Sequence, residues 1–188
     1  MCSGIPNRAI QFDRRACEIN LHKSSHATTL AAGLLEGTSR AGVYHRSKEP
    51  RDSPPRAAIF ASRDIGVNSL DSWCSRDCAV GVARIHGRPV LLVSIYMDIK
   101  LPVEQQWLTD LMSMIQSKGY PVIMGIDSNA HSTLYGPDNN ARGDDMEDFI
   151  LRHAFQVENI GQVPTFEVRR ANTNVATHID VTLSRPAL

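Results

Sequence analysis

The sequence predicts an α/β protein in which two β-sheets pack face to face and are flanked by helices. Two apolar segments, 78–85 and 89–96, flank His86-Gly87-Arg88, where the glycine can supply the positive φ of a hairpin turn. Apolar residues recur at helical spacing in 102–118, and the apolar segment 121–126 is typical of a buried strand. A hairpin, a helix, a strand, a second helix and further strands, in that order, indicate a mixed α/β architecture.

Two helices are expected in this part of the chain. The first, 102–118, has a proline in its first turn and Gly119 directly after its end, which are the positions that these residues prefer. The second, 144–152, opens with acidic residues, which a helix N-terminus favours. The remaining strands are predicted from short apolar segments at 57–62, 155–159, 164–168 and 177–183.

The first 56 residues differ in composition from the rest. They are rich in Arg, Ser, His and Pro, and the segment 46–56 (RSKEPRDSPPR) is typical of a loop. A brief helix is expected over 24–35 (SSHATTLAAGLL). No internal repeat or linker divides the sequence, so we expect one domain over 1–188.

Length and composition indicate an ordinary soluble protein. Of its 188 residues, 42% are hydrophobic and 21% are charged, and no apolar run approaches the roughly 20 residues that span a bilayer. The N-terminus lacks the layout of a signal peptide, which suggests an intracellular protein. The four cysteines lack zinc-site spacing and are expected to be reduced thiols.

The charge balance bears on the possible partners. The 20 basic residues equal the 20 acidic residues in number, which disfavours tight non-specific DNA binding. A nuclease is not excluded, because it needs carboxylates to hold metal as well as basic groups to approach DNA.

The first candidate site follows the strand 121–126. That strand delivers Asp127 to the loop at its end, and Asn129 comes two residues later. In a strand-like conformation these two side chains point the same way and can share one cleft. The carboxylate can act as a general base or metal ligand, and the amide can orient a phosphate or a water. Asp-Ser-Asn is also ordinary turn chemistry, and the residues alone leave both interpretations open.

The second candidate site lies in 177–183, where polar and apolar positions alternate. Asp180 lies on the same side as His178 if the strand is regular. An unpaired buried carboxylate is costly, so Asp180 needs a partner or a function. An exposed strand face would explain the same pattern.

Four stretches together resemble a known family: GIDSNAHSTLYG, NNARGDDMEDFI, ENIGQVPTF and ATHIDVTLS. They are similar to the endonuclease domain of R1-like non-LTR retrotransposons. That domain belongs to the endonuclease/exonuclease/phosphatase superfamily, whose DNase I-like fold is a two-sheet α/β-sandwich. The resemblance covers 57–184 well and 16–35 more loosely, while 1–56 as a whole is divergent.

The resemblance implies a set of catalytic and metal-binding residues. Tyr96 matches the tyrosine that contacts the scissile phosphate, and Asp127 matches the aspartate that activates the attacking water. Asn129 matches the asparagine that positions the water or the phosphate. Asp180 matches the carboxylate that orients the catalytic histidine. Asn20, together with Asp127, matches the metal site.

Three further residues gain roles from the same resemblance. His131 matches the histidine of the Asn-Ala-His motif and is expected to be catalytic. Thr165 and Phe166 match a segment near the active-site floor and are expected to bind substrate. Simpler interpretations stay open for Tyr96, as an aromatic at the edge of the core, and for His131, as a turn-capping residue.

The sequence departs from the family pattern at two places. The family's metal-binding glutamate lies in a Gln-Glu-Pro motif after its second strand, where this chain offers only Glu36 and Glu49, and neither follows a buried strand. The family's Ser-Asp-His motif lies about thirty residues beyond the Ile-Asp strand, whereas this sequence stops at Leu188. We therefore expect a fold incomplete at the second strand and the C-terminus, from a fragment or decayed copy of a retrotransposon gene.

The resemblance implies a metal-dependent endonuclease that nicks DNA and leaves a 3′-hydroxyl to prime reverse transcription. The expected cofactor is Mg²⁺ or Mn²⁺, and no small-molecule cofactor is expected. The expected partner is DNA, and no association with a membrane is expected. The resemblance also implies a monomer that acts in the nucleus. Because two family residues are missing, we expect weak nicking or none from the isolated chain. Another phosphoesterase of the superfamily and a non-catalytic remnant of the fold are the alternatives.

Overall fold

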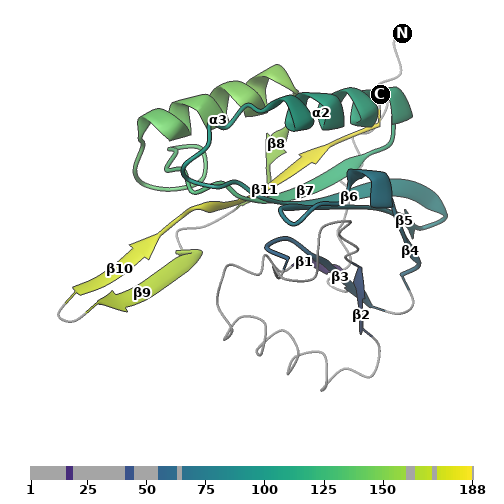
Figure 1. The fold of residues 1–188 in the computed structure, drawn as a ribbon, viewed down its shortest axis with the longest axis horizontal. Coiled ribbons are helices and arrows are strands. Elements are labelled where there is room, and N and C mark those ends of the chain that lie inside the picture. The colour runs from purple at the N-terminus through teal and green to yellow at the C-terminus, as the bar shows by residue number, and fades with distance from the viewer. Residues whose placement is uncertain are drawn as a thin grey trace, which may run out of the picture.

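A mixed six-stranded β-sheet forms the centre of the protein (Figure 1). The computed structural model describes residues 16–18, 41–44, 55–62, 65–159, 164–170 and 173–187. Within these residues the strand order is β4-β5-β6-β7-β11-β8, in which β6 and β7 are parallel and the other neighbours antiparallel. The strands are β4 (Val67–Ser69), β5 (Cys78–Ile85), β6 (Arg88–Tyr96), β7 (Val122–Asp127), β8 (Gln156–Val157) and β11 (Asp180–Arg185).

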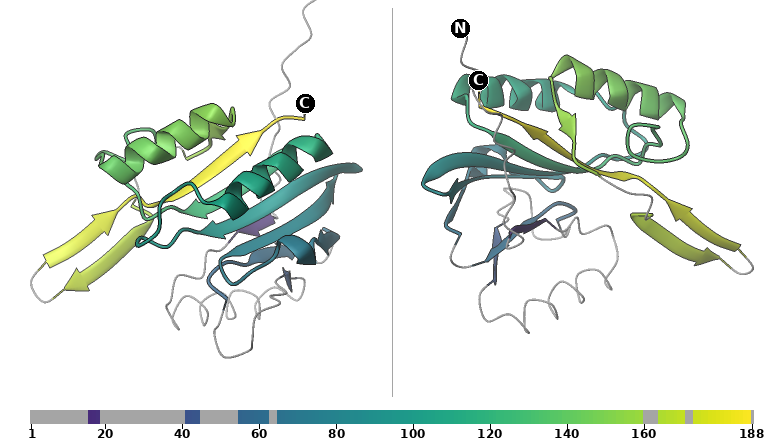
Figure 2. Two further views of the ribbon diagram at one scale, coloured as in Figure 1. Left: turned by 45° about the horizontal axis from the view of Figure 1, so that its top comes forward. Right: turned by 180° about the vertical axis from the view of Figure 1, so that it is seen from behind.

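Two layers cover the faces of this sheet, as Figures 1 and 2 show. Helices α2 (Gln106–Lys118) and α3 (Ala141–Arg152) lie on one face. A three-stranded sheet lies on the other, with the order β1 (Ala16–Glu18), β3 (Ile59–Ser62) and β2 (Ala41–Tyr44). The predicted architecture of two packed sheets with helices is confirmed.

Side-chain alternation along β6 explains why both faces are covered. Leu91 and Ile95 belong to a core shared with the helices, whereas Val90 and Leu92 pack in a second core with Ile59 of β3. Successive residues of a strand point to opposite faces, so a nearly continuous apolar strand must be buried on both sides.

The predicted hairpin of β5 and β6 is confirmed, with a shorter turn than expected. His86 (φ 50°) and Gly87 (φ 78°) form a two-residue turn, and Arg88 already pairs with Ile85. Two successive residues with positive φ match the hand of the strand twist, which is why such turns are favoured in hairpins.

Helix α2 begins later than predicted. The helix starts at Gln106, after Gln105 in an extended conformation, so Pro102 lies outside it. The chain before it is held by Arg142 of α3, which donates hydrogen bonds to the main-chain oxygens of Asp98 and Leu101. This long-range contact is invisible in the local pattern. Gly119 (φ 63°) ends the helix, as predicted.

The boundaries of α3 and of the late strands also differ from the prediction. α3 starts at Ala141, because the side chain of Asn140 caps it by accepting a hydrogen bond from the amide of Gly143 (2.8 Å). The predicted strand 155–159 is reduced to β8. Two strands that pair with each other, β9 (Phe166–Arg170) and β10 (Thr173–Thr177), replace the single strand expected over 164–168, and β11 begins only at Asp180.

Several expectations fall on residues outside those described. They concern the helix over 24–35, Asn20, Glu36 and Glu49. Among the described residues, no helix combines the length and apolar character needed to cross a membrane.

Candidate active site

Three polar residues lie side by side at one end of the six-stranded sheet. Asp127 ends β7, and it is the register partner of Tyr96 at the end of β6 and of Asp180 at the start of β11. Directly opposed side chains of an antiparallel pair lie on the same face with Cβ atoms about 5 Å apart. Their neighbours Ile95, Ile126 and Val181 belong to the core under the helices, so the three polar side chains point toward the other sheet.

Asp127 and Asp180 differ in their surroundings. Asp127 is 1% exposed, whereas Asp180 is half-buried. The main chain of Asp180 is held by Thr165, whose hydroxyl accepts hydrogen bonds from the amides of Ile179 and Asp180 (3.1 Å each). The structure thus gives Thr165 a positioning contact at the site. The substrate-binding role predicted for Thr165 and for Phe166, which starts β9, stays a prediction.

Asn129 lies at the site, but its backbone conformation differs from the strand-like one that was expected. β7 ends at Asp127, and Asn129 has φ 49°, so the strand-like relation assumed for the two residues is wrong. Asparagine tolerates this left-handed conformation better than most residues do. Its side-chain amide donates to the main-chain oxygen of Met97 (2.9 Å) and also hydrogen-bonds Tyr96. The amide therefore links the chain that follows β7 to the end of β6.

Arg56 is a residue of the site that the sequence interpretation missed. Its guanidinium lies 4.1 Å from the ring centroid of Tyr96 and is held by Asp77, through two hydrogen bonds of 2.5 Å, and by Asp98 at 2.9 Å. Arg56 is 7% exposed, so the phenol ring rests against a fixed cation. The sequence assigned Arg56 to a proline-rich loop, and the nearest signal was its position directly before the strand 57–62.

The phenol of Tyr96 is kept neutral by its surroundings. Burial raises the pKa of Tyr96, and the charges of Asp127 and Asp98 act in the same direction, while Arg56 and the hydrogen bond from Asn129 oppose them. A tyrosine is neutral below its pKa, so a raised pKa extends the pH range in which its hydroxyl can donate a hydrogen bond to a phosphate oxygen.

We expect Arg56→Met to lower the free energy of unfolding by about 2–3 kcal/mol, because Asp77 and Asp98 lose their partner at partly buried positions. Arg56→Lys should recover less than half of this loss, since lysine cannot donate the paired hydrogen bonds. Urea unfolding measures both effects. The exposed Arg88→Met provides the matched control, and an equal loss in Arg56→Met and Arg88→Met would contradict the contact.

Arg142 hydrogen-bonds both the loop after β7 and the loop after β6. Besides its bonds to the oxygens of Asp98 and Leu101, its Nε donates to the oxygen of Ser128 (2.9 Å). Ser128 is fully buried, and its hydroxyl donates to the oxygen of Ile179 (2.6 Å) next to Asp180. The ends of β6, β7 and β11 are therefore joined by a continuous set of hydrogen bonds.

His131 contributes its main chain to this arrangement. Its oxygen accepts from the amide of Asn140 (3.0 Å), and its own amide donates to the side chain of Asn140 (3.3 Å). This pair docks the loop after β7 on the N-terminus of α3. The catalytic role predicted for the imidazole of His131 stays a prediction.

The donor set suits a divalent cation that is completed by substrate. Mg²⁺ binds proteins through one or two carboxylates plus substrate phosphate oxygens, and Asp127 and Asp180 supply two carboxylates at opposed positions. The described residues contain no cluster of three or more His, Cys, Asp or Glu side chains that could hold a metal by itself. Cys74 and Cys78 are buried free thiols, and burial raises the pKa of Cys78.

Comparisons with known proteins bear on the family and the fold. The family model described as endonuclease-reverse transcriptase matches residues 90–188. The structure is similar to the endonuclease domain of TRAS1, a telomere-specific non-LTR retrotransposon, with a TM-score of 0.73 and 24% identity over 88% of this chain and 82% of that one. No curated protein sequence matches this chain.

More distant structures share the fold. An endonuclease/exonuclease/phosphatase family protein from Bacteroides thetaiotaomicron has a TM-score of 0.56 and 17% identity over 85% of this chain and 66% of that one. A mannosyl-6-phosphatase from the same organism has a TM-score of 0.56 and 18% identity over 85% of this chain and 68% of that one. The DNase I-like two-sheet fold that the sequence predicted is confirmed.

Proposed function

Because the chain belongs to the endonuclease-reverse transcriptase family, we propose that it is a DNA-nicking endonuclease domain of the kind found in non-LTR retrotransposons. The observation that carries this proposal is the placement of Tyr96, Asp127 and Asp180 on three adjacent strand ends, facing the same side of the sheet. In this proposal the protein acts as a monomer on nuclear DNA, next to a reverse transcriptase.

The proposed reaction is hydrolysis of one phosphodiester bond. Asp127 accepts a proton from a water molecule, whose oxygen attacks phosphorus in line with the departing 3′ oxygen. The bond from phosphorus to that oxygen breaks, the oxygen takes up a proton to give a 3′-hydroxyl, and the other end keeps a 5′-phosphate. Tyr96 donates a hydrogen bond to a phosphate oxygen. Asn129, whose side-chain NH2 group already bonds Met97 and Tyr96, orients the water by accepting a hydrogen bond through its side-chain oxygen.

Asp180 and a divalent cation complete the proposed site. Asp127 and Asp180 would hold Mg²⁺ or Mn²⁺ together with a phosphate oxygen, and the cation, when bound, polarises the phosphate. Thr165 and Ser128 hold the main chain around Asp180 in place, so the carboxylate keeps its position opposite Asp127.

Substrate class separates this function from its alternatives. We expect the chain with Mg²⁺, in excess over the plasmid, to convert supercoiled plasmid slowly to open circles and to leave a simple phosphate monoester intact. Release of phosphate from the monoester, without nicking, would favour another phosphoesterase of the superfamily. DNA binding without any cleavage would favour a non-catalytic remnant of the fold.

Tyr96→Phe is expected to lower the nicking rate by about ten- to a hundredfold, because it removes one hydrogen bond to a charged phosphate. The pKa of Tyr96 is raised, so the wild-type hydroxyl stays protonated and the ratio of the two rates should be constant from about pH 6 to about pH 9. Plasmid nicking by both proteins across this pH range measures the ratio. A ratio that collapses toward one as the pH rises would mean that the phenol ionises within this range, against the proposed role.

A further inference from the structure

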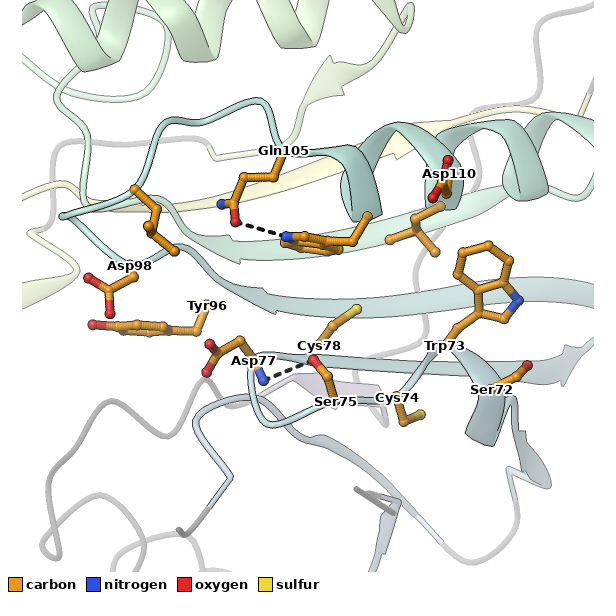
Figure 3. A pocket seen from close by; sticks show the side chains of 13 residues that line it. Ser72, Trp73, Cys74, Ser75, Asp77, Cys78, Tyr96, Asp98, Gln105 and Asp110 are labelled. Carbon is orange, nitrogen blue, oxygen red and sulfur yellow. Dashed lines mark hydrogen bonds between the residues drawn. The ribbon is translucent and has the colours of Figure 1, made fainter. Parts of the chain in front are cut away.

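A cleft of about 370 Å³ begins at Tyr96 and runs away from it along the chain before β5 (Figure 3). Tyr96 and Asp98 lie at one end of the cleft, and Trp73 and Asp110 lie at the other. Helix α2 and the short helix Asp71–Trp73 form its outer walls. Its volume is that of a pocket for a small ligand, and it opens from a residue of the candidate active site.

Aromatic side chains line this cleft. The sequence contains two tryptophans, Trp73 and Trp107, and both are half-buried cleft residues. The indole of Trp107 is held by Gln105, whose side-chain oxygen accepts its hydrogen bond (3.1 Å) while its amide donates to the oxygen of Pro102 (3.1 Å). A fixed indole in the same cleft as Tyr96 is the kind of surface on which nucleobases stack.

The charges of the cleft beyond Tyr96 favour a base over a phosphate. None of the described residues that line it is basic, and three are acidic: Asp77, Asp98 and Asp110. Arg56 occupies both oxygens of Asp77 and one oxygen of Asp98 from outside the lining. Asp110 is exposed and accepts a hydrogen bond from Gln106 through Oδ1 (2.9 Å), which leaves Oδ2 available for a ligand.

We propose that this cleft, here named the tryptophan cleft, holds a nucleobase of the cleaved strand that has left the base stack beside the scissile phosphate. The proposal rests on the proposed nuclease function. Carboxylate oxygens accept from the exocyclic amino groups of adenine, cytosine and guanine, which thymine lacks. The cleft therefore takes an amino-bearing base, and entry is easiest for a base that is unpaired or mismatched.

Intrinsic fluorescence tests the binding without catalysis, because both tryptophans of the chain lie in the cleft. Single-stranded oligonucleotides in EDTA should quench this fluorescence and bind about five- to a hundredfold more tightly than abasic oligonucleotides of equal length. The quenching and the gain in affinity should be seen with oligonucleotides of dA or dC and should be weaker with oligonucleotides of dT. Equal quenching and affinity for the abasic strand would overturn the proposal.

Cleavage of designed duplexes tests the base preference. With wild type, a mismatched dC or dA beside the nick should be cut faster than a mismatched dT. Asp110→Asn should reduce this preference about five- to tenfold, since it replaces the charged acceptor by an amide. Asp148→Asn, an exposed acidic residue on α3 outside the cleft, controls for the change of charge.

The outcomes separate this inference from the proposed function. If wild type shows base-dependent quenching but no nicking, the nuclease proposal fails and the tryptophan cleft stands as a base-binding site. If wild type nicks DNA but Asp110→Asn keeps the full base preference and the abasic strand binds equally, the cleft proposal is overturned. Thermal melting shows whether Asp110→Asn is folded, and Trp107→Phe gives a second variant that should weaken quenching selectively.

Discussion

Replacing Asp127 with asparagine is expected to lower the nicking rate by about a hundred- to ten-thousandfold, the range of a general base. Asparagine has nearly the same shape as aspartate, so it fits a position that is 1% exposed, but its amide cannot accept the proton of the attacking water. The measurement is the single-turnover rate of plasmid nicking in Mg²⁺.

Two controls make the Asp127→Asn result specific. Asp148→Asn removes an exposed carboxylate of α3, which is not part of the three strand ends, and should nick at the wild-type rate. Thermal melting should show that Asp127→Asn is folded, because asparagine fits the shape of the aspartate site. A folded Asp127→Asn variant with wild-type nicking would rule out this residue as the base.

The second large effect is expected from Gly143→Ala, which should cost about 3 kcal/mol in the free energy of unfolding. A Cβ at this position would lie 1.7 Å from the main-chain oxygen of His131 and 2.5 Å from Oδ1 of Asn139. Alanine favours helices over glycine by about 1 kcal/mol, but the clash with a main-chain atom forces the loop or the helix to move, which outweighs this gain. Urea unfolding measures the difference.

Gly66→Ala is the matched control for this substitution. A Cβ at Gly66 meets nothing within 4 Å, so the change should be close to neutral. His131 and Asn140 dock the loop after β7 on α3. Because Gly143→Ala displaces this loop, which follows Asp127, the substitution should also slow nicking. Equal stability of the two alanine variants would show that the loop is not packed against α3 as described.

The strand ends of the site could be predicted from the sequence because they depend on local patterns. An apolar strand that runs into Asp127 and an apolar strand that ends at Tyr96 are each legible from alternation and composition. The resemblance to the family then assigned both residues, together with Asp180, to one active site. The register that makes Asp127 the partner of both residues is a property of the sheet, and only the structure gives it.

The supporting contacts could not be predicted, because they join residues far apart in the sequence. Arg56 lies in a segment whose prolines and charges indicate a loop, yet its guanidinium packs on Tyr96, forty positions later. Arg142 sits in a helix and reaches the chain after β6. The tryptophan cleft likewise combines the short helix before β5 with α2, and its residues gave no motif.

The expectation of weak activity rests on the glutamate of the family's Gln-Glu-Pro motif. Glu36 and Glu49, the only candidates for the metal-binding glutamate, lie outside the described residues. Weak nicking therefore stays a prediction. Rates should be measured with the chain in excess over plasmid, so that slow cleavage is still scored.

Single-turnover nicking by four proteins tests most directly whether the three strand ends form one catalytic site. The proteins are wild type, Asp127→Asn, Asp180→Asn and the double variant, each in Mg²⁺ and in EDTA. Residues that act as a unit are not additive, so we predict Mg²⁺-dependent nicking by wild type, a large loss in each single variant and little further loss in the double variant. Nicking at one rate by all four proteins, or by wild type in EDTA, would contradict the account.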